Sequence, residues 1–139
     1  MDVPEGFEDL FDDGSRAFLV LATLRGGERP VVAPVWFASD ESGLLFTTDP
    51  TAAKARDMRA HPQVAGVVIA EGDHERYVSV RGEAVEVADP ASVGIDVDAL
   101  YRRIVRRYEG REPNAPFDGA VFRLVPQRMT GYDYRDLDV

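Results

Sequence analysis

The sequence contains no cysteine. Disulfides, thiolate metal sites, iron–sulfur clusters and cysteine nucleophiles are therefore excluded. Its two histidines, His61 and His74, form no metal-ligand spacing with other residues, so we predict no metal site. A glycine-rich phosphate loop, a dinucleotide-binding fingerprint and a nucleophile–base pair are also missing. If the protein is an enzyme, these absences indicate that a bound cofactor carries the reaction.

The sequence also lacks long hydrophobic runs and an excess of positive charge. No apolar run approaches the length of a membrane-spanning helix, and Met1 is followed by an acidic segment rather than by a signal peptide. The net charge is −9, with 25 acidic and 16 basic residues. Such a balance argues against nucleic acid or an anionic membrane as a partner. We therefore expect a cytoplasmic protein with neither of these partners.

Lysine is almost missing, because fifteen of the sixteen basic residues are arginine and Lys54 is the single lysine. It follows a predicted strand that ends in Thr47 and Thr48. Asp49 and Pro50 then fit the N-cap and the first residue of a helix. The free amides of the first turn, the two hydroxyls and the Lys54 ammonium would together form a phosphate-binding site. The alternative from this local pattern is a surface helix with an empty N-terminus.

The residues that are present describe one globular domain over residues 1–139, with 45% hydrophobic and 29% charged residues. Apolar periodicity predicts strands over 16–24, 29–38, 44–48, 64–70, 77–87, 119–125 and 128–134, with a bulge at Gly82. Helices are predicted over 3–12 (within an N-terminal lead-in of residues 1–14), over 50–60, and from Asp96 or Asp98 to Glu109. Six or seven strands at hairpin spacing indicate a mainly β fold, an antiparallel barrel with helices at its ends.

Two prolines mark one edge of the second predicted strand. Pro30 and Pro34 have the same parity along the strand, so both remove amide donors from the same edge, while Val32 keeps its own. That edge cannot pair fully with a neighbouring strand. Two interpretations stay open: an edge strand protected against aggregation, or a backbone edge that contacts a flat heterocycle.

The last predicted helix has two distinct faces. Its apolar stripe consists of Leu100, Tyr101, Ile104, Val105 and Tyr108. Its other face carries Arg102, Arg103, Arg106 and Arg107, a local reversal of charge in an acidic chain. The simpler interpretation is a solvated face whose arginines pair with nearby carboxylates.

Four segments, taken in order, resemble one protein family. They are Ala-Thr-Leu at 22–24, Pro-Val-Val-Ala-Pro-Val-Trp-Phe at 30–37, Phe-Thr-Thr-Asp-Pro-Thr-Ala-Ala-Lys-Ala-Arg at 46–56, and Arg-Gly-Glu-Ala at 81–84. This order is similar to that of the pyridoxamine-phosphate-oxidase-like split-barrel flavoproteins, and most similar to the short members that use the deazaflavin coenzyme F-420. The resemblance implies a homodimer of Greek-key split β-barrels, each with two or three helices, and a cofactor in the groove between protomers.

The resemblance also implies a set of cofactor-binding residues. The phosphate would be held by Thr47, Thr48, Lys54 and Arg56, with Ala52 and Ala53 beside it at the start of the same helix. The ring would lie against Val32, Ala33, Pro34 and Val35. Tyr132 would touch the cofactor from the partner chain. The FMN-binding oxidases of the family place serine and arginine directly before the lysine, whereas Ala52 and Ala53 stand there in this sequence. That departure favours F-420 over FMN.

The implied activity is hydride transfer from the reduced deazaflavin to an electron-poor double bond of a small molecule. No catalytic side chain is assigned, and the final proton would come from solvent or from a tyrosine such as Tyr77. The alternatives are an FMN-binding reductase or oxidase, a non-catalytic flavin- or deazaflavin-binding protein, and a haem protein, which the histidine positions disfavour. The resemblance gives the arginine face a second interpretation, as a track for the acidic tail of F-420. Vitamin B6 oxidation is not predicted.

Overall fold

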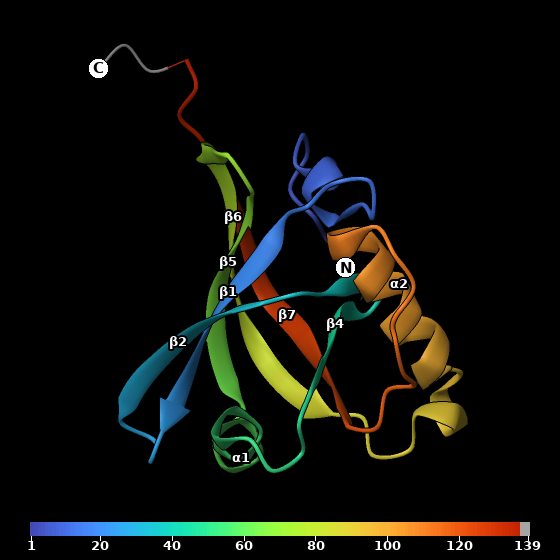
Figure 1. Cartoon of the computed structure of the whole chain (residues 1–139). Helices are drawn as coiled ribbons and strands as arrows, with labels where there is room; N and C mark the ends of the chain where they lie inside the picture. Colours follow the sequence, from blue (N-terminus) through green and yellow to red (C-terminus); the bar gives the residue numbers. More distant parts are fainter. Residues whose placement is uncertain (137–139) are drawn as a thin grey trace.

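The computed structural model describes residues 1–136, and Figure 1 shows the course of the chain. The elements are η1 (Glu8–Phe11), β1 (Phe18–Arg25), β2 (Arg29–Val35), β3 (Ala38–Asp40), β4 (Gly43–Thr48), α1 (Ala53–Ala60), β5 (Gln63–Ala70), β6 (Asp73–Glu86), η2 (Pro90–Val93), α2 (Val97–Glu109) and β7 (Ala120–Asp133). All strand pairs are antiparallel, in the order β2-β1-β5-β6-β7-β4-β3. The predicted mainly β fold, a split barrel with two principal helices, is confirmed.

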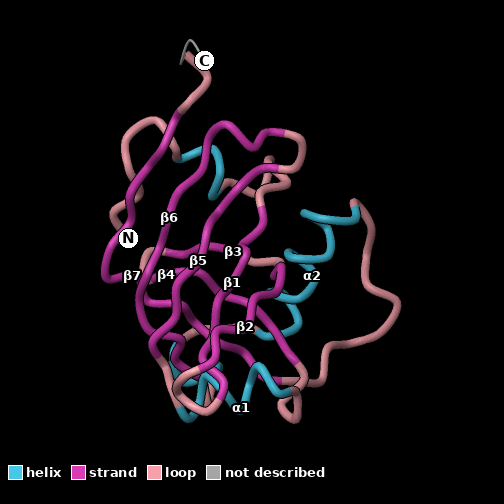
Figure 2. The backbone as a smooth tube through the Cα atoms, turned by 90° about the vertical axis from the view of Figure 1, so that its left-hand side faces the viewer, coloured by secondary structure: helices cyan, strands magenta, loops and turns pink. Residues whose placement is uncertain are grey.

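The curved sheet encloses the main core. Alternation along the strands sends one set of side chains inward, and the largest fully buried ones include Phe37, Phe46 and Phe122. Helix α1 lies across one end of the strands and α2 along one side (Figure 2). Ala55 and Met58 of α1 complete the main core. A second core lies beneath α2, whose Leu100, Ile104 and Tyr108 pack on Ala38, Leu45 and Val121.

Strand β2 lies at the end of the sheet order and pairs only with β1 within the described chain. Leu24 lies opposite Pro30, and Val20 lies opposite Pro34. An edge strand tolerates two prolines because their missing amides can lie on its unpaired side. The predicted sheet edge is therefore confirmed.

Several predicted elements differ from the structure. The helix predicted over 3–12 is reduced to the single 3-10 turn η1, because Gly6, with a φ of 88°, has a non-helical backbone within the predicted span. The predicted break at Pro126 is absent, and β7 runs continuously past it. The bulge predicted at Gly82 is a register shift between Arg81 and Gly82, and the extra residue, Gln127, belongs to β7.

Helix α2 starts after Asp96, one of the two starts that the sequence left open, and ends at Glu109 as predicted. Asp96 is the N-cap and accepts a hydrogen bond from the Ala99 amide at 3.1 Å, and Gly110 ends the helix at a φ of 66°. These are the residue types that such positions favour. Within residues 1–136, no helix has the length and hydrophobicity that crossing a membrane would require.

The arginine face of α2 is not a continuous solvated strip. Arg102 pairs with Asp98, Arg103 with Asp13, and Arg106 with Glu112. Arg107, which the helical pattern places on the same face, is only 7% exposed. Its guanidinium donates hydrogen bonds to the carbonyl oxygens of Leu10, Ser15 and Phe37 at 2.8–3.0 Å. The simpler interpretation holds for the first three, and Arg107 is a buried structural residue.

Candidate functional site

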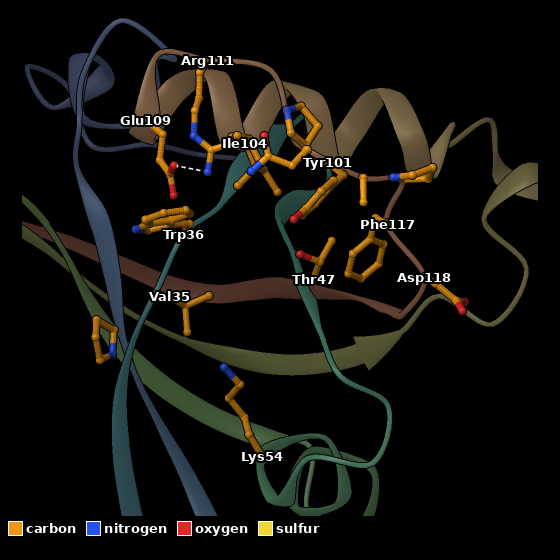
Figure 3. A pocket seen from close by; sticks show the side chains of 16 residues that line it. Val35, Trp36, Thr47, Lys54, Tyr101, Ile104, Glu109, Arg111, Phe117 and Asp118 are labelled. Carbon is orange, nitrogen blue, oxygen red and sulfur yellow. Dashed lines mark ion pairs between the residues drawn. The ribbon is translucent and has the colours of Figure 1, made fainter.

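A pocket of about 500 Å³ opens where β2, β4, α1 and α2 meet the segment 110–118. Figure 3 shows this pocket from close by. Its lining residues are Pro34, Val35, Trp36, Thr47, Lys54, Tyr101, Ile104, Val105, Glu109, Arg111, Pro113, Asn114, Ala115, Pro116, Phe117 and Asp118. Four of the predicted cofactor-binding residues are therefore brought together: Pro34, Val35, Thr47 and Lys54. They come from three elements of the fold.

Lys54 supplies a positive charge at one end of the pocket, toward which its side chain extends (Figure 3). In residues 1–136, no carboxylate forms an ion pair with Lys54, and no acidic residue stands in the first turn of α1. Burial lowers the pKa of its ammonium below the usual range. A partly desolvated cation near the positive end of a helix dipole is unfavourable without an anion. The geometry therefore fits a phosphate or carboxylate ligand.

Helix α1 begins later than the sequence predicts. The N-cap is Ala52 rather than Asp49, and Pro50 lies outside the helix. The Asp49 carboxylate instead accepts hydrogen bonds from the amide and the hydroxyl of Thr51, both at 2.8 Å. This local Asx turn competes with the helical arrangement. Lys54 consequently occupies the second helical position, close to the free amides of the first turn.

The two threonines at the end of β4 have different surroundings. Thr47 lines the pocket and Thr48 does not. Successive residues of a strand point to opposite faces, and the register places Thr47 opposite Val121 and Thr48 opposite Ala120. Only one of the two predicted hydroxyls thus faces the pocket that Lys54 enters.

The remaining predicted residues lie outside the pocket in the single chain. They are Val32, Ala33, Ala52, Ala53, Arg56 and Tyr132. Arg56 is exposed, and two residues along a helix turn its side chain well away from that of Lys54. Tyr132 lies in β7, stacked on Tyr77 at 5.1 Å between ring centroids. Contact of Tyr132 with a cofactor stays a prediction that requires a second chain.

Several pocket residues were not predicted from the sequence. Tyr101 of α2 stacks on Phe117 of the following loop, with ring centroids 4.9 Å apart. Trp36 lies near the ion pair between Glu109 and Arg111, whose charged atoms are 2.5 Å apart (Figure 3). The end of α2 and the loop after it reach the pocket only through tertiary packing. The one available signal was Trp36, a large aromatic residue directly after the edge strand.

The pocket contains no obvious metal site. Within the described residues, no group of three or more His, Asp or Glu side chains is positioned to hold a metal ion. The polar groups of the pocket instead suit an organic anion: one ammonium, one hydroxyl and the amides at the start of α1. Its aromatic residues suit a planar ring.

Comparisons with known proteins agree with this architecture. The model of the family described as pyridoxamine 5'-phosphate oxidase matches residues 8–133. A pyridoxine/pyridoxamine 5'-phosphate oxidase from Rubrobacter xylanophilus is 28% identical over 145 residues, which cover 85% of this chain and 66% of that protein. The chain thus spans just under two thirds of the length of this curated relative.

Two solved structures extend the comparison. An F-420 reductase is 32% identical with a TM-score of 0.71, over 92% of this chain and 98% of that one. A conserved hypothetical protein from Mycobacterium tuberculosis has a TM-score of 0.74 at 22% identity, over 99% of this chain and 92% of that one. At that lower identity the likeness shows the fold alone.

Proposed function

The chain belongs to the pyridoxamine 5'-phosphate oxidase family, and we propose that it is an oxidoreductase that binds coenzyme F-420 and transfers hydride to an electron-poor small molecule. The observation that carries this proposal is the placement of Lys54. The partly desolvated ammonium, which pairs with no carboxylate of residues 1–136, extends into a pocket that also holds the Thr47 hydroxyl and several aromatic side chains. A cofactor with a phosphate and a planar ring matches both parts of the pocket.

Two features support F-420 over FMN. The F-420 reductase covers nearly the whole chain at the higher identity. Ala52 and Ala53 precede Lys54 where the resemblance to FMN-binding oxidases implies serine and arginine. A site with fewer phosphate ligands suits a cofactor that also has other anionic groups to hold. FMN is the competing cofactor, and equilibrium dialysis against each cofactor distinguishes the two.

The residues of the chain would bind and orient the cofactor. Lys54 and Thr47 would hold the phosphate through charge-assisted hydrogen bonds. Pro34 and Val35, at the end of the edge strand, would lie beside the ring. The bound deazaflavin supplies hydride chemistry, and the walls formed by Tyr101 and Phe117 would exclude water from it.

We further propose that a second copy of the chain covers the outer face of the sheet. Leu19, Leu21 and Val68 point into the core, so Val20 of β1 and Val67 of β5, which lie opposite each other, point outward. Val32 on the adjacent edge strand is 61% exposed. An apolar surface across three strands favours cover by another protein. A homodimer would place Tyr132 of each protomer near its partner.

Equilibrium dialysis of the purified protein against F-420 and, separately, against FMN tests the assignment. We expect F-420 to bind more tightly, with a change in its visible absorption spectrum on binding. Tighter binding of FMN would show that FMN is the cofactor and would leave the assignment of the binding site unchanged. Absence of binding by both cofactors would overturn the proposal. Binding of F-420 with no transfer to any member of an enone and quinone panel would identify a non-catalytic binding protein.

A further inference from the structure

Two arginines of the sheet face each other without a carboxylate partner in the described part of the chain. Strands β6 and β7 run side by side (Figure 1), and their register places Arg81 directly opposite Arg128. Both residues are exposed. Within residues 1–136, ten of the fifteen arginines form ion pairs with Asp or Glu, but neither of these two does. Because like charges directly opposite each other on neighbouring strands are destabilising, the pair requires a counter-charge.

An irregularity in the strand register creates this pairing. Gly82 lies opposite Pro126. Regular pairing would therefore bring the next residue of β7, Gln127, opposite Arg81. The extra residue in β7 shifts the register by one and brings Arg128 there instead. Bulges commonly re-aim a side chain, and this one exchanges a neutral amide for a second guanidinium.

The two guanidiniums border a hollow of about 300 Å³ on the outer face of the sheet. Its other polar side chains are the hydroxyls of Ser79, Thr130 and Tyr132. Ser79 lies opposite Thr130, two residues along the strands from the arginine pair. Guanidiniums and hydroxyls can all donate hydrogen bonds, and none of the described residues that line the hollow is acidic. The hollow therefore gathers positive charge and donors on a chain whose net charge is −9.

We propose that Arg81 and Arg128 bind a small dissolved dianion, of the size of phosphate or a short dicarboxylate, at a site separate from the pocket that Lys54 enters. A guanidinium presents a fork of donors that matches the oxygens of phosphate and carboxylate groups. Two guanidiniums require two negative charges for neutralisation, which a single carboxylate does not provide. The hollow and the Lys54 pocket share no lining residue, so the inference does not depend on the proposed cofactor.

Isothermal titration calorimetry with inorganic phosphate at constant ionic strength tests the site. The titrations use Lys54→Met protein, so that phosphate at the Lys54 end of the other pocket does not contribute. Each further substitution, Arg81→Gln or Arg128→Gln, removes one charged fork and should weaken phosphate binding roughly three- to tenfold. The constant ionic strength separates a bound anion from general screening.

Arg29→Gln in the same Lys54→Met protein is the matched control. Arg29 is exposed and also lies opposite an arginine, but that residue, Arg25, forms an ion pair with Asp57. The phosphate Kd should therefore stay unchanged in Arg29→Gln. A loss equal to that of Arg81→Gln would reduce the effect to the general charge of the protein and would overturn the inference.

The stability of the protein gives a second readout. In phosphate-free buffer of low ionic strength, Arg81→Gln should raise the urea midpoint, because it removes a repulsion between like charges. Added phosphate should raise the midpoint of the protein that retains both arginines more than that of Arg81→Gln, since the ligand binds the folded state. A lower midpoint of Arg81→Gln in phosphate-free buffer would contradict an uncompensated pair.

Three further results would overturn the inference. The first is an absence of phosphate binding, or an equal affinity with and without the arginine pair. The second is displacement of phosphate from the arginine pair by F-420 in the wild type, which would assign the pair to the cofactor. The third is a lower mass of Arg81→Gln in light scattering together with no phosphate binding, which would make a carboxylate of a second copy the occupant.

Discussion

Arg107 and Phe37 are 70 residues apart in the sequence but in direct contact in the fold. The Arg107 guanidinium donates a 2.8 Å hydrogen bond to the Phe37 carbonyl oxygen, and its central carbon lies 4.5 Å from the centroid of the Phe37 ring. The same guanidinium binds the carbonyl oxygens of Leu10 and Ser15. One side chain of α2 thus ties the N-terminal segment to the residues between β2 and β3.

We expect Arg107→Met to destabilise the protein by about 2–4 kcal/mol, because buried carbonyl groups would lose their donors. Urea unfolding followed by circular dichroism measures this change. Arg106→Met is the matched control, since Arg106 pairs with the exposed Glu112 and such pairs contribute roughly 0–1 kcal/mol. Equal effects of the two substitutions would contradict the structural role of Arg107.

Lys54→Met should reduce F-420 affinity while leaving the free energy of unfolding of the cofactor-free protein unchanged or slightly higher. A charge-assisted phosphate contact is worth about 1.5–3 kcal/mol, or roughly ten- to hundredfold in Kd. The stability of the empty protein should not fall, because the charge that is removed is partly desolvated and has no carboxylate partner among the residues that the structure describes. Dialysis and urea unfolding supply the two measurements. Unchanged affinity would remove Lys54 from the site.

Cofactor affinity should fall as the pH rises, with a midpoint below that of an ordinary lysine. Burial depresses the pKa of Lys54 below 10.5, and only its protonated form attracts phosphate. Affinity is therefore fully present below the pKa of the folded state and is lost as the pH rises through it. Dialysis from about pH 7 to about pH 10 measures the profile. Lys54→Arg should bind without this decline, because an arginine stays protonated.

Val32→Glu should convert a dimer into a monomer. Val32 is 61% exposed on the edge strand, next to the apolar surface that we assign to the second copy, and burying an unpaired carboxylate there is costly. Light scattering at micromolar concentration reads the mass directly. Val93→Glu, at a similarly exposed valine in η2, should stay dimeric. A monomeric wild type would contradict the proposed dimer.

The sequence by itself determined the main features of the fold. Alternating apolar residues identify the strands, because each must bury one face. Pro30 and Pro34 placed β2 at a sheet edge, since proline cannot donate a hydrogen bond to a neighbouring strand. The sequence ended α2 at Glu109 and left its start open between Asp96 and Asp98, and the structure has Asp96 as the N-cap. Lys54 is conspicuous in the sequence alone, because every other basic position of the chain is an arginine.

The tertiary structure alone decided the composition of the pocket. Local rules placed Asp49 at the start of α1, but its turn with Thr51 shifted that start to Ala53, a competition that single-residue preferences do not resolve. The sequence pattern placed Arg107 on the same helix face as Arg102, Arg103 and Arg106. Only the packing of the N-terminal segment against α2 gave Arg107 buried carbonyl partners. Trp36, Tyr101 and Phe117 come together from the end of β2, from α2 and from the loop that follows α2. Long-range packing, which no local pattern encodes, brings those elements around one cavity.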